Sequence, residues 1–135
     1  MSKVLAVVKD IPDEAYHKDM GLFFHSLHAT LNHILLADRL WYGRFVGQQI
    51  SITGLDQQLV ADRHQLSDAL LQQATAWVEL VSALSDQELQ GEFTYRDTKG
   101  HELTRLRGEV LDHVFNHGTH HRGQLSAAMT QLGFG

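Results

Sequence analysis

Residues 106–132 read LRGEVLDHVFNHGTHHRGQLSAAMTQL, and this stretch decides the fold of the 135-residue chain. Its apolar side chains recur at spacings that place them on one face of an α-helix. The residues that share this face are Val110, Val114, Leu125, Ala128 and Leu132. Gly133 follows directly, and a glycine in that position commonly ends a helix. The stretch therefore predicts a long amphipathic helix at the end of the sequence.

Two earlier stretches show the same periodicity. Leu22–Phe45 predicts a helix that stops at Gly47, and Gln57–Leu84 predicts another, with a loop over 48–56 between them. The first of these helices carries its apolar stripe on Phe23, Leu27, Thr30, Ile34, Trp41 and Phe45. The second carries its stripe on Leu59, Leu66, Leu70, Trp77, Val81 and Leu84. We interpret Trp41 and Trp77 as core anchors.

Shorter elements complete the chain. Lys3–Lys9 is a short apolar run, and Pro12 or Asp13 could open a helical turn. Phe93–Arg96 and His101–Thr104, joined by a turn, favour a small β-hairpin. We predict one all-α domain over 1–135, an antiparallel four-helix bundle with a shortened first helix and a hairpin before the last helix.

Composition excludes several classes of protein. Apolar residues make up 43% and charged residues 20%, as in ordinary globular chains, and no cysteine is present to form disulfides or thiolate zinc sites. The net charge of −5 argues against nucleic acid as a partner. No apolar run reaches the roughly 18 residues of a membrane span, and the first ten residues do not form a secretory signal. We therefore expect a cytoplasmic protein without a membrane partner.

The ten histidines are the strongest chemical lead. His117 and His121 are four residues apart, so their rings project from adjacent turns of one helix face and could share a metal ion. His113 and His117 have the same spacing, and His120 is also within reach, so spacing alone does not choose.

The position of each histidine relative to the apolar stripe distinguishes the candidate ligands. His121 lies about 20–40° from Val114 and Leu125 on the helical wheel, whereas His117 lies about 60° from Val114, at the edge of the stripe. His33 is the histidine nearest the stripe of the second helix, and in an antiparallel bundle it could meet the other two. A hydrogen-bonded structural role is the alternative for any buried histidine. The remaining candidates are interpreted as surface or packing residues, namely His25, His28, His64, His101, His113 and His120.

Three neutral imidazoles around one divalent ion leave open coordination positions, as in catalytic metal sites. Such an ion would lower the pKa of a bound water or thiol. No carboxylate completes a two-histidine, one-carboxylate iron site, because Asp38 projects roughly 140° away from His33. Gln124 could hold a ligand ring or a substrate, or could simply be a solvated polar residue.

Two blocks of sequence, Phe23–Trp41 and His113–Gln124, resemble the DinB (DNA-damage-inducible) family. The resemblance implies a four-helix bundle, usually a homodimer, in which His33, His117 and His121 hold a divalent metal. Characterised members include transferases and isomerases that use low-molecular-weight thiols. Members usually begin with a full helix and continue past the last one. Here about half of that first helix corresponds, Val4–Lys9, so either a partner chain or residues upstream of Met1 would cover the exposed apolar stripe.

Three hypotheses follow. The first is a metal-dependent enzyme, a thiol-dependent transferase or a hydrolase acting on a small molecule, with zinc or nickel favoured over iron, manganese or copper. Its catalytic residues beyond the metal ligands are not assigned. The second is a non-enzymatic dimer stabilised by the metal, and the third is a metal-free interaction module. We also predict a homodimer, because Leu35, Leu36 and Leu40 lie off the main stripe of their helix and suggest a second interface.

Overall fold

A computed structural model describes all residues, 1–135. The chain is mostly helical, with six helices and one two-stranded antiparallel sheet. The elements in order are α1 (Ser2–Val8), α2 (Asp13–Tyr16), α3 (Leu27–Val46), α4 (Arg63–Ser82), α5 (Asp86–Gln90), β1 (Glu92–Arg96), β2 (Glu102–Leu106) and α6 (Arg107–Gln131). No helix is both long enough and apolar enough to cross a membrane.

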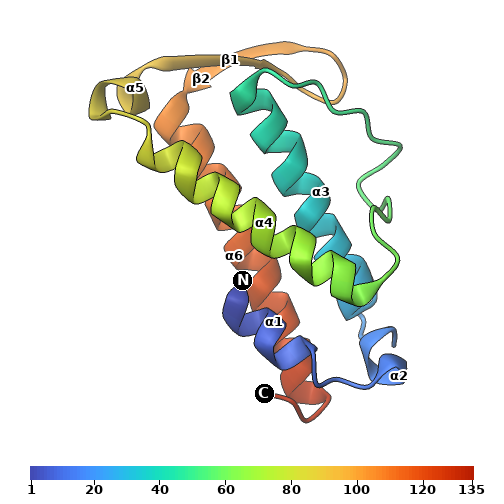
Figure 1. Cartoon of the computed structure of the whole chain (residues 1–135). Helices are drawn as coiled ribbons and strands as arrows, with labels where there is room; N and C mark the ends of the chain where they lie inside the picture. The colour runs from blue at the N-terminus through green and yellow to red at the C-terminus, as the bar shows by residue number, and fades with distance from the viewer.

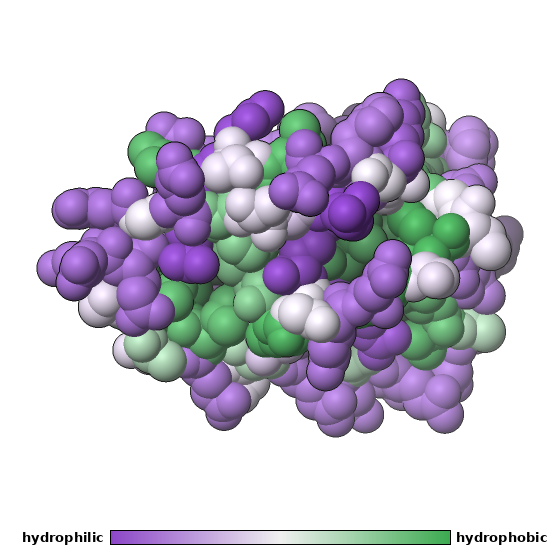
Figure 2. Space-filling view, turned by 90° about the horizontal axis from the view of Figure 1, so that it is seen from above, coloured by the Kyte–Doolittle hydropathy of each residue, from purple (hydrophilic) through white to green (hydrophobic).

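The long helices α3, α4 and α6 pack together, and α1 lies against α6 at the end remote from the hairpin (Figure 1). All four helices contribute to the main core, which contains Leu5, Leu31, Leu66 and Leu125. The hairpin crosses the opposite end of the long helices. Seen from above, hydrophilic side chains surround smaller hydrophobic patches (Figure 2).

Helix α3 begins at Leu27 and not at Leu22 as the periodicity predicts, because Ser26 caps it. The Ser26 backbone is extended, and its Oγ accepts a hydrogen bond of 3.0 Å from the Ala29 amide. The preceding residue, His25, has a positive φ of 73°, which is incompatible with a continuing helix. Phe23, predicted to lie on the helix stripe, is 78% exposed in this non-helical segment, so that prediction is wrong.

Helix α4 begins at Arg63 and not at Gln57. Asp62 caps it through a 2.8 Å bond from the Gln65 amide. The amides of Leu59 and Val60 instead donate to the side chain of Asn32 on α3, so a tertiary contact replaces the first predicted turns. The short helix α5, capped by Ser85, was not predicted.

Other predictions are confirmed. Helix α3 ends at Gly47, which adopts the left-handed conformation with φ of 74°. The hairpin pairs Glu92 with Leu106 through Arg96 with Glu102, so the first strand begins one residue before the predicted range and the second begins one residue after its predicted start and ends two residues later. Trp77 is a core residue, whereas Trp41 is only partly buried.

The prediction that α3 presents a second apolar face to a partner chain is wrong. Leu35 and Leu36 are 0% and 1% exposed, and Leu40 is partly buried, so the chain itself covers most of this face. Helix α3 is apolar on more than one side because it packs against both α4 and α6. Dimerisation stays a prediction, without that support.

Candidate metal centre

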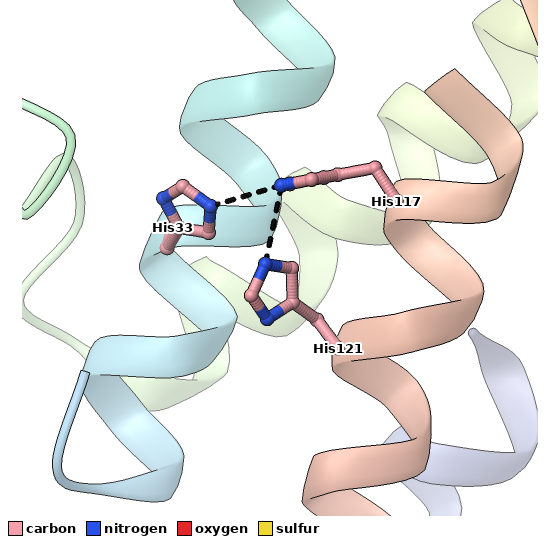
Figure 3. Close-up of side chains that lie close together, drawn as sticks. All are labelled: His33, His117 and His121. Atoms are coloured by element: carbon pink, nitrogen blue, oxygen red, sulfur yellow. Dashed lines mark hydrogen bonds between the residues drawn. The ribbon is translucent and has the colours of Figure 1, made fainter. Parts of the chain in front are cut away.

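Three histidines from two helices converge on one point (Figure 3). His33 comes from α3, and His117 and His121 come from adjacent turns of α6. One ring nitrogen of each lies within 4.8 Å of the others. The Nε2 atom of His117 is 3.2 Å from that of His33 and 3.1 Å from that of His121. The structure thus brings together the three predicted ligands.

The outer ring nitrogens fix how two of these imidazoles face the centre. His33 Nδ1 lies 2.9 Å from the Leu55 carbonyl oxygen, and His121 Nδ1 lies 2.8 Å from Gln124 Oε1. Both partners are acceptors, so each Nδ1 carries the proton and donates. Each Nε2 therefore directs a lone pair toward the centre. Gln124 holds a ligand ring, as one of its two interpretations predicts.

The three converging nitrogens have too few protons to satisfy one another. The Nε2 of His117 can carry one hydrogen when neutral, and it can donate that hydrogen to only one of its two neighbours. In the other close contact, the lone pair of the second neighbour's Nε2 then has no hydrogen to accept. A divalent cation removes this conflict, because all three nitrogens could bind it. Tetrahedral ligands at about 2.0–2.1 Å from zinc stand about 3.3 Å apart, close to the observed spacings.

Electrostatics keep the cluster neutral and available to a metal. Burial lowers the pKa of His33 and His121, although the bonds to Leu55 and Gln124 oppose that shift. Burial, followed by the charges of neighbouring histidines, lowers the pKa of His117 to about 4. At neutral pH no proton needs to leave before a metal binds.

Phe24 forms an apolar wall beside the cluster. Its ring is stacked on His33, with centroids 4.0 Å apart and planes at 17°. It also meets the edge of His121 at 5.9 Å. Phe24 reaches this position because the chain turns back before α3, a non-helical feature that the helical periodicity does not reveal.

The cluster opens into a cavity of about 390 Å³ between α3 and α6, which we call the metal pocket. Its walls are mainly apolar and include Leu36, Leu40 and Trp41. His113 and His120 are exposed, as predicted, yet both also line this pocket. A small molecule in the pocket would therefore reach the three histidines.

The other histidines stay outside the centre. His28 is buried on the far side of α3, where its Nδ1 lies 2.7 Å from the Tyr16 hydroxyl, so it is a packing residue as interpreted. Asp38 does not line the metal pocket, in agreement with the wheel, and faces a different cavity.

Comparison with known proteins places the chain in a family. The profile of the DinB family matches residues 1–134. The chain belongs to the DinB family. It is 26% identical over 133 residues to Protein DinB of Bacillus subtilis (strain 168), covering 94% of this chain and 76% of that protein.

A solved structure agrees in fold. The crystal structure of a DinB-like protein from Bacillus cereus ATCC 10987 matches with a TM-score of 0.70 and 22% sequence identity. The match covers 99% of this chain and 86% of that one, so the DinB-like arrangement of helices extends over the whole molecule.

Proposed function

We propose that this DinB-family protein is a metal-dependent enzyme in which His33, His117 and His121 hold one divalent ion. The observation that carries the proposal is the convergence of three Nε2 atoms, with too few protons to satisfy them, at the wall of an open cavity. Zinc or nickel suits an all-nitrogen ligand set best, and iron, manganese and copper also accept imidazole. Bound there, a divalent ion would supply Lewis acidity and lower the pKa of a water or thiol ligand.

The chain's own residues define what such an enzyme would act on. Leu55 and Gln124 hold two ligand rings in place. Phe24, Leu40 and Trp41 give the pocket apolar walls that would displace water around a substrate. We propose a small molecule with an apolar portion as substrate, and thiol-dependent transfer or hydrolysis as the reaction.

We further infer that α1, α3, α4 and α6 act as a four-helix bundle with α1 as its short member, and that the protein is a homodimer. The joint contribution of these helices to one core supports the bundle. Family resemblance supports the dimer.

Metal titration of the stripped protein, followed by calorimetry, tests the centre. We expect one ion per wild-type chain and at least a roughly tenfold loss of affinity in H33A, H117A and H121A. H113A and H120A are matched controls, because both histidines line the pocket without joining the cluster. Equal losses in the controls and the ligand variants would contradict the assignment.

A second experiment separates enzyme from metal-stabilised scaffold. The metal-loaded protein is assayed with low-molecular-weight thiols and a panel of electrophiles and esters, and turnover should disappear in H121A. An ion at 100 times its dissociation constant adds about 2.7 kcal/mol to the free energy of unfolding whichever function is correct. Stabilisation of that size without turnover of any panel member would favour the non-enzymatic alternative.

A further inference from the structure

A second cavity, of about 450 Å³, lies between α3, α4 and α6. It shares no lining residue with the metal pocket. Each long helix contributes polar lining residues: Asp38 from α3, Trp77 and Ser82 from α4, and Arg122 from α6. Its volume is within the range of small-molecule sites, about 300–1,000 Å³.

The Arg122 guanidinium is positioned by its neighbours on α6. Its Nη2 donates to Thr119 Oγ1 at 2.9 Å. A Cβ atom at Gly118 would lie only 2.9 Å from Nη1, so the missing side chain at this position makes room for the guanidinium. Arg122 makes no ion pair with Asp38 or any other carboxylate. The guanidinium is held in place and keeps donors for another group.

Trp77 contributes its indole to the cavity wall. Its side chain lines the cavity, the residue is only 5% exposed, and its buried Nε1 has no hydrogen-bond partner. Burial raises the pKa of the Asp38 carboxyl group to about 6, while the Arg122 charge and then the nearby Trp77 indole lower it. The Nε1 atom is itself buried, so a ligand in the cavity would contact the indole ring and not this donor.

The rest of the wall is apolar. Val78, Val81, Val114 and Phe115 are among its lining residues, and Val78 and Phe115 are exposed. Exposed apolar side chains beside convergent polar groups are typical of a ligand site.

We propose that this cavity binds a small organic carboxylate with an apolar body. The carboxylate pairs with Arg122, and the body packs on Val78, Val81 and Phe115. A guanidinium matches the planar carboxylate. A phosphate dianion would require more donors than one guanidinium supplies. The proposal is independent of the metal centre.

Fluorescence of a single-tryptophan variant tests it. W41F leaves Trp77 as the only indole, and it is titrated with phenylacetate, phenylethanol and phenethylamine, which differ in the polar group. We expect phenylacetate to give a saturable change and to bind roughly tenfold more tightly than the other two, since a charged hydrogen bond contributes about 1.5–3 kcal/mol. Equal binding of the three compounds, or no saturable change at millimolar concentration, would overturn the proposal.

Variants in the W41F background locate the site. R122Q should lose the preference for phenylacetate, and R105Q, which changes an exposed arginine outside the cavity, should keep it. G118A keeps the charge but displaces the guanidinium, so it should weaken binding even if R122Q proves unstable. H121A should bind phenylacetate normally. Unchanged phenylacetate binding in both R122Q and G118A would refute the assignment. Sedimentation that shows a dimer whose formation prevents phenylacetate binding would also refute it.

Discussion

Asn32 connects the candidate metal centre to the loop between α3 and α4. It is 1% exposed and directly precedes His33. Its Oδ1 accepts hydrogen bonds from the Leu59 and Val60 amides, both at 2.9 Å, and its Nδ2 donates to the Val60 carbonyl at 3.1 Å. The same loop supplies the Leu55 carbonyl that orients His33.

We predict that Asn32→Ala lowers both stability and metal affinity. Three hydrogen bonds to the loop are lost, at about 1 kcal/mol each, so the free energy of unfolding should fall by about 3 kcal/mol. Release of the loop also frees the Leu55 carbonyl from His33, and the loss of such an outer partner typically costs 10–100-fold in metal affinity.

Urea unfolding of the metal-free protein and calorimetric titration with zinc measure the two effects. N116A is the control, because Asn116 is exposed on α6 and its side chain makes no hydrogen bond, so its effect should stay within about 0.5 kcal/mol. If Asn32→Ala unfolds at the wild-type urea concentration and binds zinc with unchanged affinity, the loop does not support the centre and this reasoning fails.

Two other substitutions test separate parts of the fold. Burial raises the pKa of Asp38 from 3.8 to about 6, so the folded chain binds more protons than the unfolded chain between these values and stability falls as pH rises through that window. Asp38→Asn should therefore stabilise the protein at pH 8 by up to about 3 kcal/mol, and hardly at all at a pH below 3.8, the unfolded-state pKa. Equal shifts of the urea midpoint at pH 8 and at that low pH would contradict this. Asp62→Ala removes the N-cap of α4, so thermal unfolding should show a free energy of unfolding about 1 kcal/mol lower, with zinc affinity unchanged. A larger change in zinc affinity than in stability would count against a purely capping role.

Local sequence patterns account for much of the candidate centre. The four-residue spacing of His117 and His121 fixes their common face as soon as residues 107–131 form a helix. The apolar stripe then selects these two over His113 and His120, and the same argument on α3 selects His33. The end of α3 at Gly47 and the hairpin are likewise local, because they depend on turn geometry within a few residues.

The errors occur where distant residues override periodicity. The stretch before Arg63 has helical spacing, yet Asn32 takes the amides of Leu59 and Val60. Leu35 and Leu36 suggested a free face, but their burial follows from the central place of α3, which wheel analysis of one helix cannot show.

The sequence by itself determined the long helices and which histidines face inward, because both depend on contacts between neighbours on one helix. Only the tertiary structure decided that the Leu55 carbonyl and the Phe24 ring complete the surroundings of His33, and that Asp38, Trp77 and Arg122 meet in a second cavity. These groups come from segments far apart along the chain, and no local spacing encodes how packed helices bring them together.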